Sequence, residues 1–129
     1  MTLRTPLGRV LGTGSAKEGP ATWRAERVSS VALIPLTLWF VAALLALPGL
    51  DYATVRGWLA QPWNGLLALM LVAVMTYHAY LGSRVIVEDY VHRAAPKLAA
   101  LLLLRFAYAA LGGASLFAIL RIAFGSSTP

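Results

Sequence analysis

Three long apolar runs, separated by short polar segments, restrict most strongly how this chain can fold. The runs cover residues 28–47, 65–87 and 98–124. A helix of about 20 residues rises by about 30 Å, the thickness of the hydrocarbon core of a bilayer. Hydrophobic residues make up 59% of the 129 residues and charged residues only 12%, too few to coat a soluble domain. The sequence therefore predicts an all-α membrane protein with three transmembrane helices.

Basic residues are distributed unevenly along the chain and predict its orientation. Residues 1–27 carry five of them and the segment around the second polar loop carries Arg84, Arg93 and Lys97, whereas the first loop has only Arg56. By the positive-inside rule, we expect a cytoplasmic N-terminus and a periplasmic C-terminus. The net charge of +6 is then explained by membrane topology, and no nucleic acid partner is expected.

Two regions follow from these patterns: a cytoplasmic N-terminal segment, 1–27, and a three-helix anchor domain, 28–129. The first segment stays polar, without the apolar core of a signal peptide, so we expect it to be retained. Its glycines predict an irregular chain up to a helix start near Ala21. Pro35 predicts a kink that neighbouring helices can accommodate. The loop up to Asn64 contains Trp58 and Trp63, which are typical of a membrane surface.

Several classes of chemistry are excluded by the sequence. The chain has no cysteine, which excludes disulfides and cysteine-held clusters within it. No phosphate-binding loop, dinucleotide fingerprint or zinc-protease motif is present. Three spans are too few to enclose a substrate path, so we expect a subunit that is not catalytic alone and that packs on a partner. A patch of small residues in the third run favours such packing: Ala109, Gly112, Gly113, Ala114 and Ser115.

His78 lies inside the second apolar run, and Gly82 follows one helical turn later on the same face. A histidine beside a residue without a side chain leaves room for a flat macrocycle, and histidine is an axial ligand of haem iron. The pattern also fits a histidine that hydrogen-bonds a neighbouring helix, with Gly82 as a packing contact. Periodicity alone leaves both interpretations open.

Three further polar residues are candidates at the cytoplasmic boundary. If the helix continues, Asp89 lies eleven positions after His78, close to three turns, and therefore on nearly the same face. The phenol of Tyr90 can donate a hydrogen bond to a carbonyl ligand dissolved in lipid. Arg27 can pair with a carboxylate. Interfacial tyrosine and arginine are also common as simple anchors. Arg105 can reach back to the interface or pair with Glu88 or Asp89.

In three places the residues resemble a known family. These are GSAKEG at 14–19 with Trp23 and Arg27 behind it, ALIPLTLWFV at 32–41, and H-x3-G-x6-D-Y from His78 to Tyr90. Together they resemble the small hydrophobic membrane anchor subunit of succinate dehydrogenase, respiratory complex II, in its alphaproteobacterial form. Family members often have His-Trp where this chain has Thr22-Trp23, and Gln in place of Glu26.

The resemblance implies a multi-pass protein of the bacterial inner membrane that passes electrons to ubiquinone. It implies haem b between two anchors, with His78 as one axial ligand of the iron and Arg27 as a propionate partner. It implies Tyr90 as a hydrogen-bond donor to the quinone, with Asp89 shaping that site. The implied partners are a second membrane anchor subunit, an iron–sulfur subunit with its clusters and a flavoprotein subunit with FAD.

Other functions remain as alternatives. An anchor of a fumarate reductase has the same architecture, because the direction of electron flow depends on cofactor potentials. A cofactor-free membrane scaffold or assembly protein would use His78 only for packing. A small oligomeric transporter is disfavoured because no acidic residue lies in the middle of a predicted span.

Overall fold

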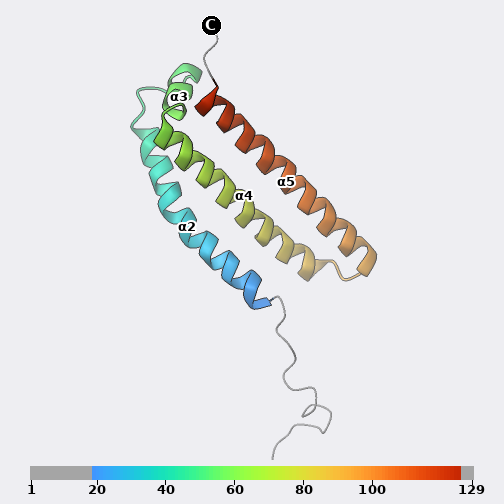
Figure 1. The fold of residues 1–129 in the computed structure, drawn as a ribbon. Helices are drawn as coiled ribbons and strands as arrows, with labels where there is room; N and C mark the ends of the chain where they lie inside the picture. Colours follow the sequence, from blue (N-terminus) through green and yellow to red (C-terminus); the bar gives the residue numbers. More distant parts are fainter. Residues whose placement is uncertain (1–18, 126–129) are drawn as a thin grey trace, which may run out of the picture.

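The computed structural model describes residues 19–125, which form three long helices and one short one (Figure 1). In chain order they are α2 (Gly19–Leu45), α3 (Tyr52–Leu59), α4 (Pro62–Tyr90) and α5 (Ala94–Phe124). The expectations for residues 1–18, which include all of the GSAKEG segment except Gly19, lie outside the described residues. The described part of the chain contains no strand, so the predicted all-α fold is confirmed there.

The three long helices are each long and apolar enough to cross a membrane. The candidate spans are Pro20–Leu45, Pro62–Tyr90 and Ala94–Phe124, with mean hydropathies of 2.2, 1.6 and 1.7. This agrees with the predicted three-span membrane fold, whereas the orientation of the termini stays a prediction. All three helices begin before their apolar runs, and the first turns of α2, 19–27, belong to the segment that the sequence assigned to the polar N-terminus. At its other end α2 stops at Leu45, two residues before its run ends. At 29 residues, α4 is about 44 Å long, so its ends lie beyond the bilayer core unless it tilts.

Local sequence explains where the helices begin and end. Pro62 occupies the first turn of α4, where its missing N–H group is not needed. Val91 ends α4 in an extended conformation, and α5 begins soon afterwards at Ala94. Pro35 lies inside α2 without ending it, although a proline removes one backbone hydrogen bond of the helix.

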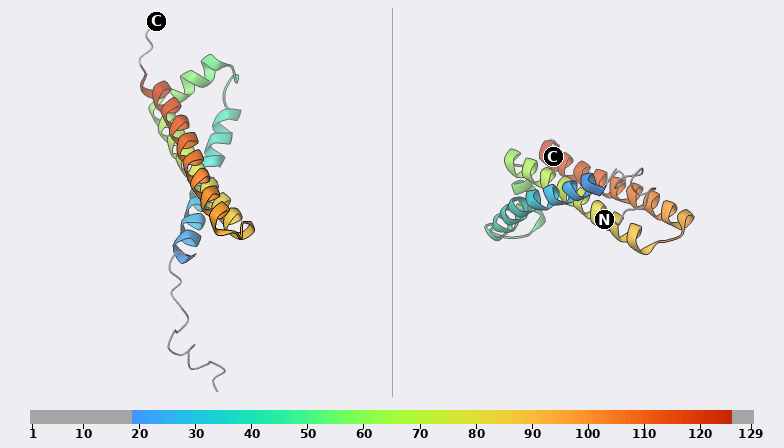
Figure 2. Two further views of the ribbon diagram at one scale, coloured as in Figure 1. Left: turned by 90° about the vertical axis from the view of Figure 1, so that its right-hand side faces the viewer. Right: turned by 90° about the horizontal axis from the view of Figure 1, so that it is seen from below.

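Helix α4 is the centre of the fold. It packs against α2 on one side and α5 on the other, and α2 and α5 do not pack on each other within residues 19–125 (Figures 1 and 2). The buried apolar side chains are few: Leu36, Ala68, Leu71 and Leu81. Most of the apolar surface of the three helices is therefore left for lipid or for other proteins.

Gly112 permits the close contact between α4 and α5. A Cβ atom at this position would lie 2.9 Å from Cγ2 of Thr76, a branched side chain that cannot easily turn away. At the adjacent Gly113, a Cβ atom would meet nothing within 4 Å. Of the small residues predicted to form a packing face, Gly112 thus packs against α4 of the same chain. Gly113 makes no such contact with the described residues.

The short helix α3 covers the end of the bundle opposite the α4–α5 turn (Figure 1). Asp51 caps its N-terminus by accepting hydrogen bonds from the hydroxyl and the backbone N–H of Thr54, at 2.7 and 3.0 Å. These bonds lower the pKa of the Asp51 carboxyl, and the hydrogen bond from the Thr54 hydroxyl has the largest effect. The capping carboxylate is therefore ionised at neutral pH.

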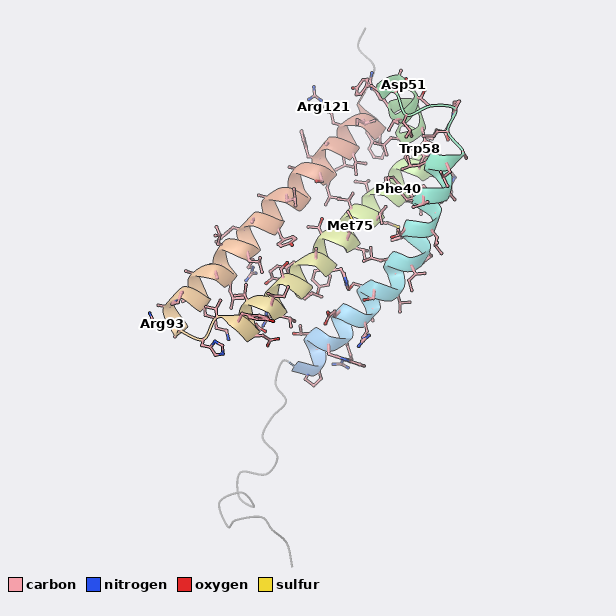
Figure 3. The ribbon with its side chains drawn as sticks, turned by 180° about the vertical axis from the view of Figure 1, so that it is seen from behind. Phe40, Asp51, Trp58, Met75, Arg93 and Arg121 are labelled. Carbon is pink, nitrogen blue, oxygen red and sulfur yellow. The ribbon has the colours of Figure 1, made fainter. Side chains whose placement is uncertain are left out.

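Aromatic contacts join α3 to α2. The rings of Trp39 and Trp58 stack with centroids 5.7 Å apart, and Phe40 contacts Trp58 at 6.2 Å (Figure 3). Such pairs stabilise by about 0.5–1.5 kcal/mol beyond their buried area. Trp58 is thus a packing residue, whereas Trp63 is 75% exposed, as expected for a membrane-surface residue.

Gly112→Ala should weaken the α4–α5 contact by about 1–3 kcal/mol, because the added methyl group overlaps Thr76. The measurement is a denaturant titration of the purified protein in detergent micelles, followed by loss of helical circular dichroism. Gly113→Ala is the matched control and should leave the transition unchanged or raise it slightly. Equal destabilisation by both substitutions would contradict the assigned role of Gly112.

Candidate functional site

His78 is held by a hydrogen bond between two helices. Its ring atom Nδ1 lies 2.9 Å from Oγ of Ser29 on α2, and Ser29 Oγ lies 2.9 Å from the carbonyl oxygen of Glu26. Within residues 19–125, Ser29 is the one buried polar side chain, with 5% of its surface exposed. The other ring nitrogen of His78, Nε2, has no hydrogen-bond partner among these residues. Of the two interpretations left open by the sequence, the hydrogen bond to a neighbouring helix is confirmed, and it uses only one nitrogen.

Gly82 leaves open space one turn beyond His78. A Cβ atom there would meet nothing within 4 Å, in contrast to Gly112. The alternative in which Gly82 is a packing contact is therefore wrong within the described part of this chain. An imidazole nitrogen without a partner among the described residues, one turn from a glycine with open space in front of it, suits a flat group that binds through iron. The residues present thus fit a haem, provided that a partner supplies the second axial ligand.

The described residues contain no cluster of three or more histidine, cysteine or acidic side chains that could hold a metal ion. His92, the second histidine of the sequence, is exposed in the α4–α5 turn, with Nδ1 3.2 Å from the Tyr90 carbonyl oxygen.

Asp89 and Tyr90 form the last turn of α4, so the condition that the helix continues this far is met. Both side chains are exposed, Tyr90 by 80%. Along the helix axis Asp89 lies about 16 Å from His78. The structure therefore places the two candidate sites on one helix but does not bring these residues together. The Tyr90 hydroxyl has no hydrogen-bond partner among residues 19–125.

No hydrogen bond joins Arg27 to His78 within residues 19–125. Its guanidinium carbon lies 5.7 Å from the ring centroid of Trp23, and both side chains are exposed. Arg27 precedes Ser29 by two positions, or roughly 200° around the helix, so it points away from the α4-facing side of α2. A contact between Arg27 and a group bound at His78 would need that group to extend around the edge of α2.

A small polar network fixes the turn between α4 and α5. Arg84 Nε donates to a carboxylate oxygen of Glu88 at 2.7 Å, and Lys97 Nζ donates to the Glu88 carbonyl oxygen at 2.7 Å. The Arg84 and Glu88 side chains are 29% and 35% exposed, so their ion pair contributes little to stability. With Arg93 beside this turn (Figure 3), charged groups gather at this end of the bundle.

Sequence reasoning missed a groove between α4 and α5. It has a volume of about 560 Å³, and its lining includes Thr76, Tyr77, Tyr80, Arg105 and Tyr108. Tyr108 also forms a 2.9 Å hydrogen bond with Ser83. Arg105 thus lines this groove and forms no ion pair with Glu88 or Asp89. His78 is not among the lining residues, because it is on the side of α4 that faces α2.

Besides the groove, sequence reasoning missed Ser29 as a functional candidate. The sequence signal was present, since a serine at the start of an apolar run must find a hydrogen-bond partner in the membrane. Its partner was not predictable, because it depends on how α2 crosses α4.

These features define a class of protein: a multi-pass membrane subunit with most of its apolar surface uncovered and a histidine that offers one ring nitrogen. Residues 1–118 match the family described as succinate dehydrogenase/fumarate reductase transmembrane subunit. The chain belongs to this family, so the resemblance identified from the sequence is confirmed.

Named relatives agree with this assignment. The chain is 30% identical over 122 residues to the succinate dehydrogenase hydrophobic membrane anchor subunit of Paracoccus denitrificans, which covers 95% of this chain and 94% of the relative. It is 33% identical over 88 residues to the protein of the same name from Rickettsia bellii, covering 68% and 70% of the two chains. For Rickettsia conorii the identity is 35% over 89 residues, covering 68% and 71%. The matches support a membrane anchor subunit of succinate dehydrogenase.

Proposed function

We propose that this chain anchors a succinate:ubiquinone oxidoreductase in the bacterial inner membrane and supplies one axial ligand of haem b through His78. The observation that carries the proposal is the hydrogen bonding of His78: Nδ1 is bonded to Ser29, whereas Nε2 has no partner within residues 19–125, and Gly82 one turn later leaves open space. A haem with two histidine ligands supplies one-electron redox chemistry when it is bound. The second ligand would come from the second membrane anchor subunit.

Arg27 is the proposed partner of a haem propionate. Its guanidinium is exposed near the start of α2 and is paired with a ring rather than with a carboxylate. A guanidinium binds a carboxylate through two parallel hydrogen bonds, which an aromatic neighbour does not prevent.

The end of α4 is the proposed contribution to ubiquinone binding. Tyr90 presents an exposed hydroxyl that can donate to a quinone carbonyl, and Asp89 stands next to it as a group that can hold a proton. A quinone dissolved in lipid reaches an exposed site at the membrane boundary without crossing the protein. A hydrogen bond of this kind strengthens as negative charge develops on the quinone oxygen.

The proposed partners are the second anchor, an iron–sulfur subunit and a flavoprotein subunit that carries FAD. The charged end of the bundle, with Tyr90 and Asp89, is where we place the iron–sulfur subunit, on the cytoplasmic side expected from the positive-inside rule. The large uncovered apolar surface of α2, α4 and α5 supports contact with another membrane subunit.

Two alternatives remain testable. The family description covers fumarate reductase as well as succinate dehydrogenase, and both use the same architecture. A cofactor-free scaffold would use the His78–Ser29 hydrogen bond only to hold α2 against α4.

His78→Leu should abolish or shift the b-type signal in a reduced-minus-oxidised absorption spectrum, because the iron loses one ligand. The spectrum is recorded on the complex purified through a tag on this chain. His92→Leu is the matched control and should keep the native signal, since His92 is exposed in the turn. An intact native four-subunit complex without any b-type signal would instead favour the cofactor-free scaffold.

Gly82→Leu should lower the haem content of the purified complex, because its side chain would project into the space one turn from His78, where a Cβ atom meets nothing within 4 Å. Gly82→Ala, which adds one methyl group, should have the smaller effect. Haem is quantified per complex by the pyridine haemochrome method. Full haem occupancy in Gly82→Leu would mean that the group does not lie against this face.

Tyr90→Phe should lower succinate:ubiquinone reductase activity by roughly 10-fold or more, the effect of losing a hydrogen bond to a group that gains charge. Succinate oxidation measured with a soluble artificial electron acceptor should be unchanged, because it bypasses the quinone site. Tyr52→Phe, at the exposed start of α3, is the control for removal of a phenol hydroxyl. Unchanged quinone reduction in Tyr90→Phe would exclude Tyr90 from the site.

A further inference from the structure

We infer that Ser29 is a positioning residue that sets the tautomer of His78 and so leaves Nε2 as the nitrogen with the free electron pair. The inference rests on two contacts of one hydroxyl group. Ser29 Oγ lies 2.9 Å from Nδ1 of His78 and 2.9 Å from the carbonyl oxygen of Glu26. The consequence for haem also rests on the proposed function of His78, but the tautomer itself does not.

The directions of these two hydrogen bonds follow from the number of protons available. A carbonyl oxygen can only accept, so the contact with Glu26 requires the single hydroxyl proton of Ser29. The contact with His78 must then take its proton from the ring, as Nδ1–H donating to Ser29 Oγ. If Ser29 donated to His78 instead, two oxygen atoms would face each other at 2.9 Å without a proton between them. Of the two neutral tautomers, only the one with a proton on Nδ1 satisfies both contacts.

The hydroxyl is well placed to hold this arrangement. Glu26 is three residues before Ser29 on α2, and serine commonly bonds a carbonyl one turn earlier in its own helix. Ser29 is 5% exposed, so water does not compete for either contact. In such a low-dielectric environment each hydrogen bond is stronger than at a surface.

A histidine ligand is tuned by the partner of its other nitrogen. The hydrogen bond from Nδ1–H orients the ring and raises the basicity of the coordinating nitrogen, and loss of such a partner typically costs 10–100-fold in metal affinity. In this chain the bond also ties the ligand on α4 to a different helix, α2. Ser29 thus fixes both which nitrogen can bind iron and how the ring is turned about the α4 axis.

The neighbouring serine supplies a matched control. Ser30 Oγ donates to the same Glu26 carbonyl oxygen at 2.8 Å, but Ser30 makes no hydrogen bond to His78 among the described residues. Removing the Ser30 hydroxyl therefore changes the same turn of α2 without touching the imidazole. Ser29→Thr keeps the hydroxyl, and threonine in a helix can still bond the carbonyl of the previous turn.

The first experiment needs no haem. The full chain is labelled with ¹⁵N in its two histidines, reconstituted in lipid bilayers and studied by solid-state NMR at mildly alkaline pH, where imidazole is neutral. His92→Gln assigns the remaining signal to His78. We expect the Nδ1–H tautomer in the native chain, a mixture in Ser29→Ala, and the native tautomer in Ser29→Thr and Ser30→Ala. A native Nε2–H tautomer, or no change in Ser29→Ala, would overturn the inference.

The second experiment uses the intact complex purified through this chain. Ser29→Ala should raise the haem midpoint potential, because a less basic ligand favours the reduced iron, and should weaken haem retention about 10–100-fold. Ser29→Thr should restore both values, and Ser30→Ala should leave them native. A native potential and native retention in Ser29→Ala would overturn the role of Ser29 as a positioning residue.

The two experiments separate this inference from the proposed function. If the complex contains no haem but the NMR result stands, the proposed ligand role of His78 fails and the tautomer assignment holds. If haem binds through His78 and the native chain has the Nε2–H tautomer, the proposed function holds and the inference about Ser29 fails.

Discussion

The structure depends on one constraint: a chain surrounded by lipid must satisfy its backbone hydrogen bonds within itself. Helices meet this requirement segment by segment, which is why three apolar runs become three long helices. Satisfying the backbone does not bury side chains, however, and only four apolar side chains are buried in the described part of the chain. Because lipid covers apolar surface as well as protein does, the specific contacts depend on small residues and polar pairs, such as Gly112 with Thr76 and Ser29 with His78.

The different faces of helix α4 make different contacts. The side toward α5 carries Thr76 against Gly112, and the side toward α2 carries His78 against Ser29. Its last turn presents Asp89 and Tyr90 at the charged end of the bundle. Because a helix is stiff, the rise of about 18 Å from His78 to Tyr90 is set by the helix itself. In the proposed function, this fixes the offset along the α4 axis between the haem ligand and the quinone donor.

Much of this arrangement could be predicted from the sequence, because it depends on length, hydropathy and spacing along one helix. The three spans follow from the apolar runs, and the H-x3-G-x6-D-Y pattern places His78, Gly82 and Tyr90 on a single α4. Features that require two helices to meet could not be predicted. The Ser29–His78 bond and the groove that Arg105 lines both depend on crossing angles, which no periodicity within one segment encodes. The start of α2 at Gly19 lies within two residues of the start near Ala21 that the glycines before it predict.

The sequence left a structural and a ligating histidine as alternatives, yet the two roles use different atoms. Nδ1 joins α4 to α2, and this bond is the condition under which Nε2 carries a free electron pair. A leucine at position 78 would remove the helix contact together with the proposed ligand, so loss of haem in that variant combines two effects. Substitution of Ser29 removes the contact and keeps the imidazole. The loss of haem in Ser29→Ala therefore reports how much the iron bond depends on the contact between α2 and α4, and the further loss in His78→Leu reports the iron bond itself.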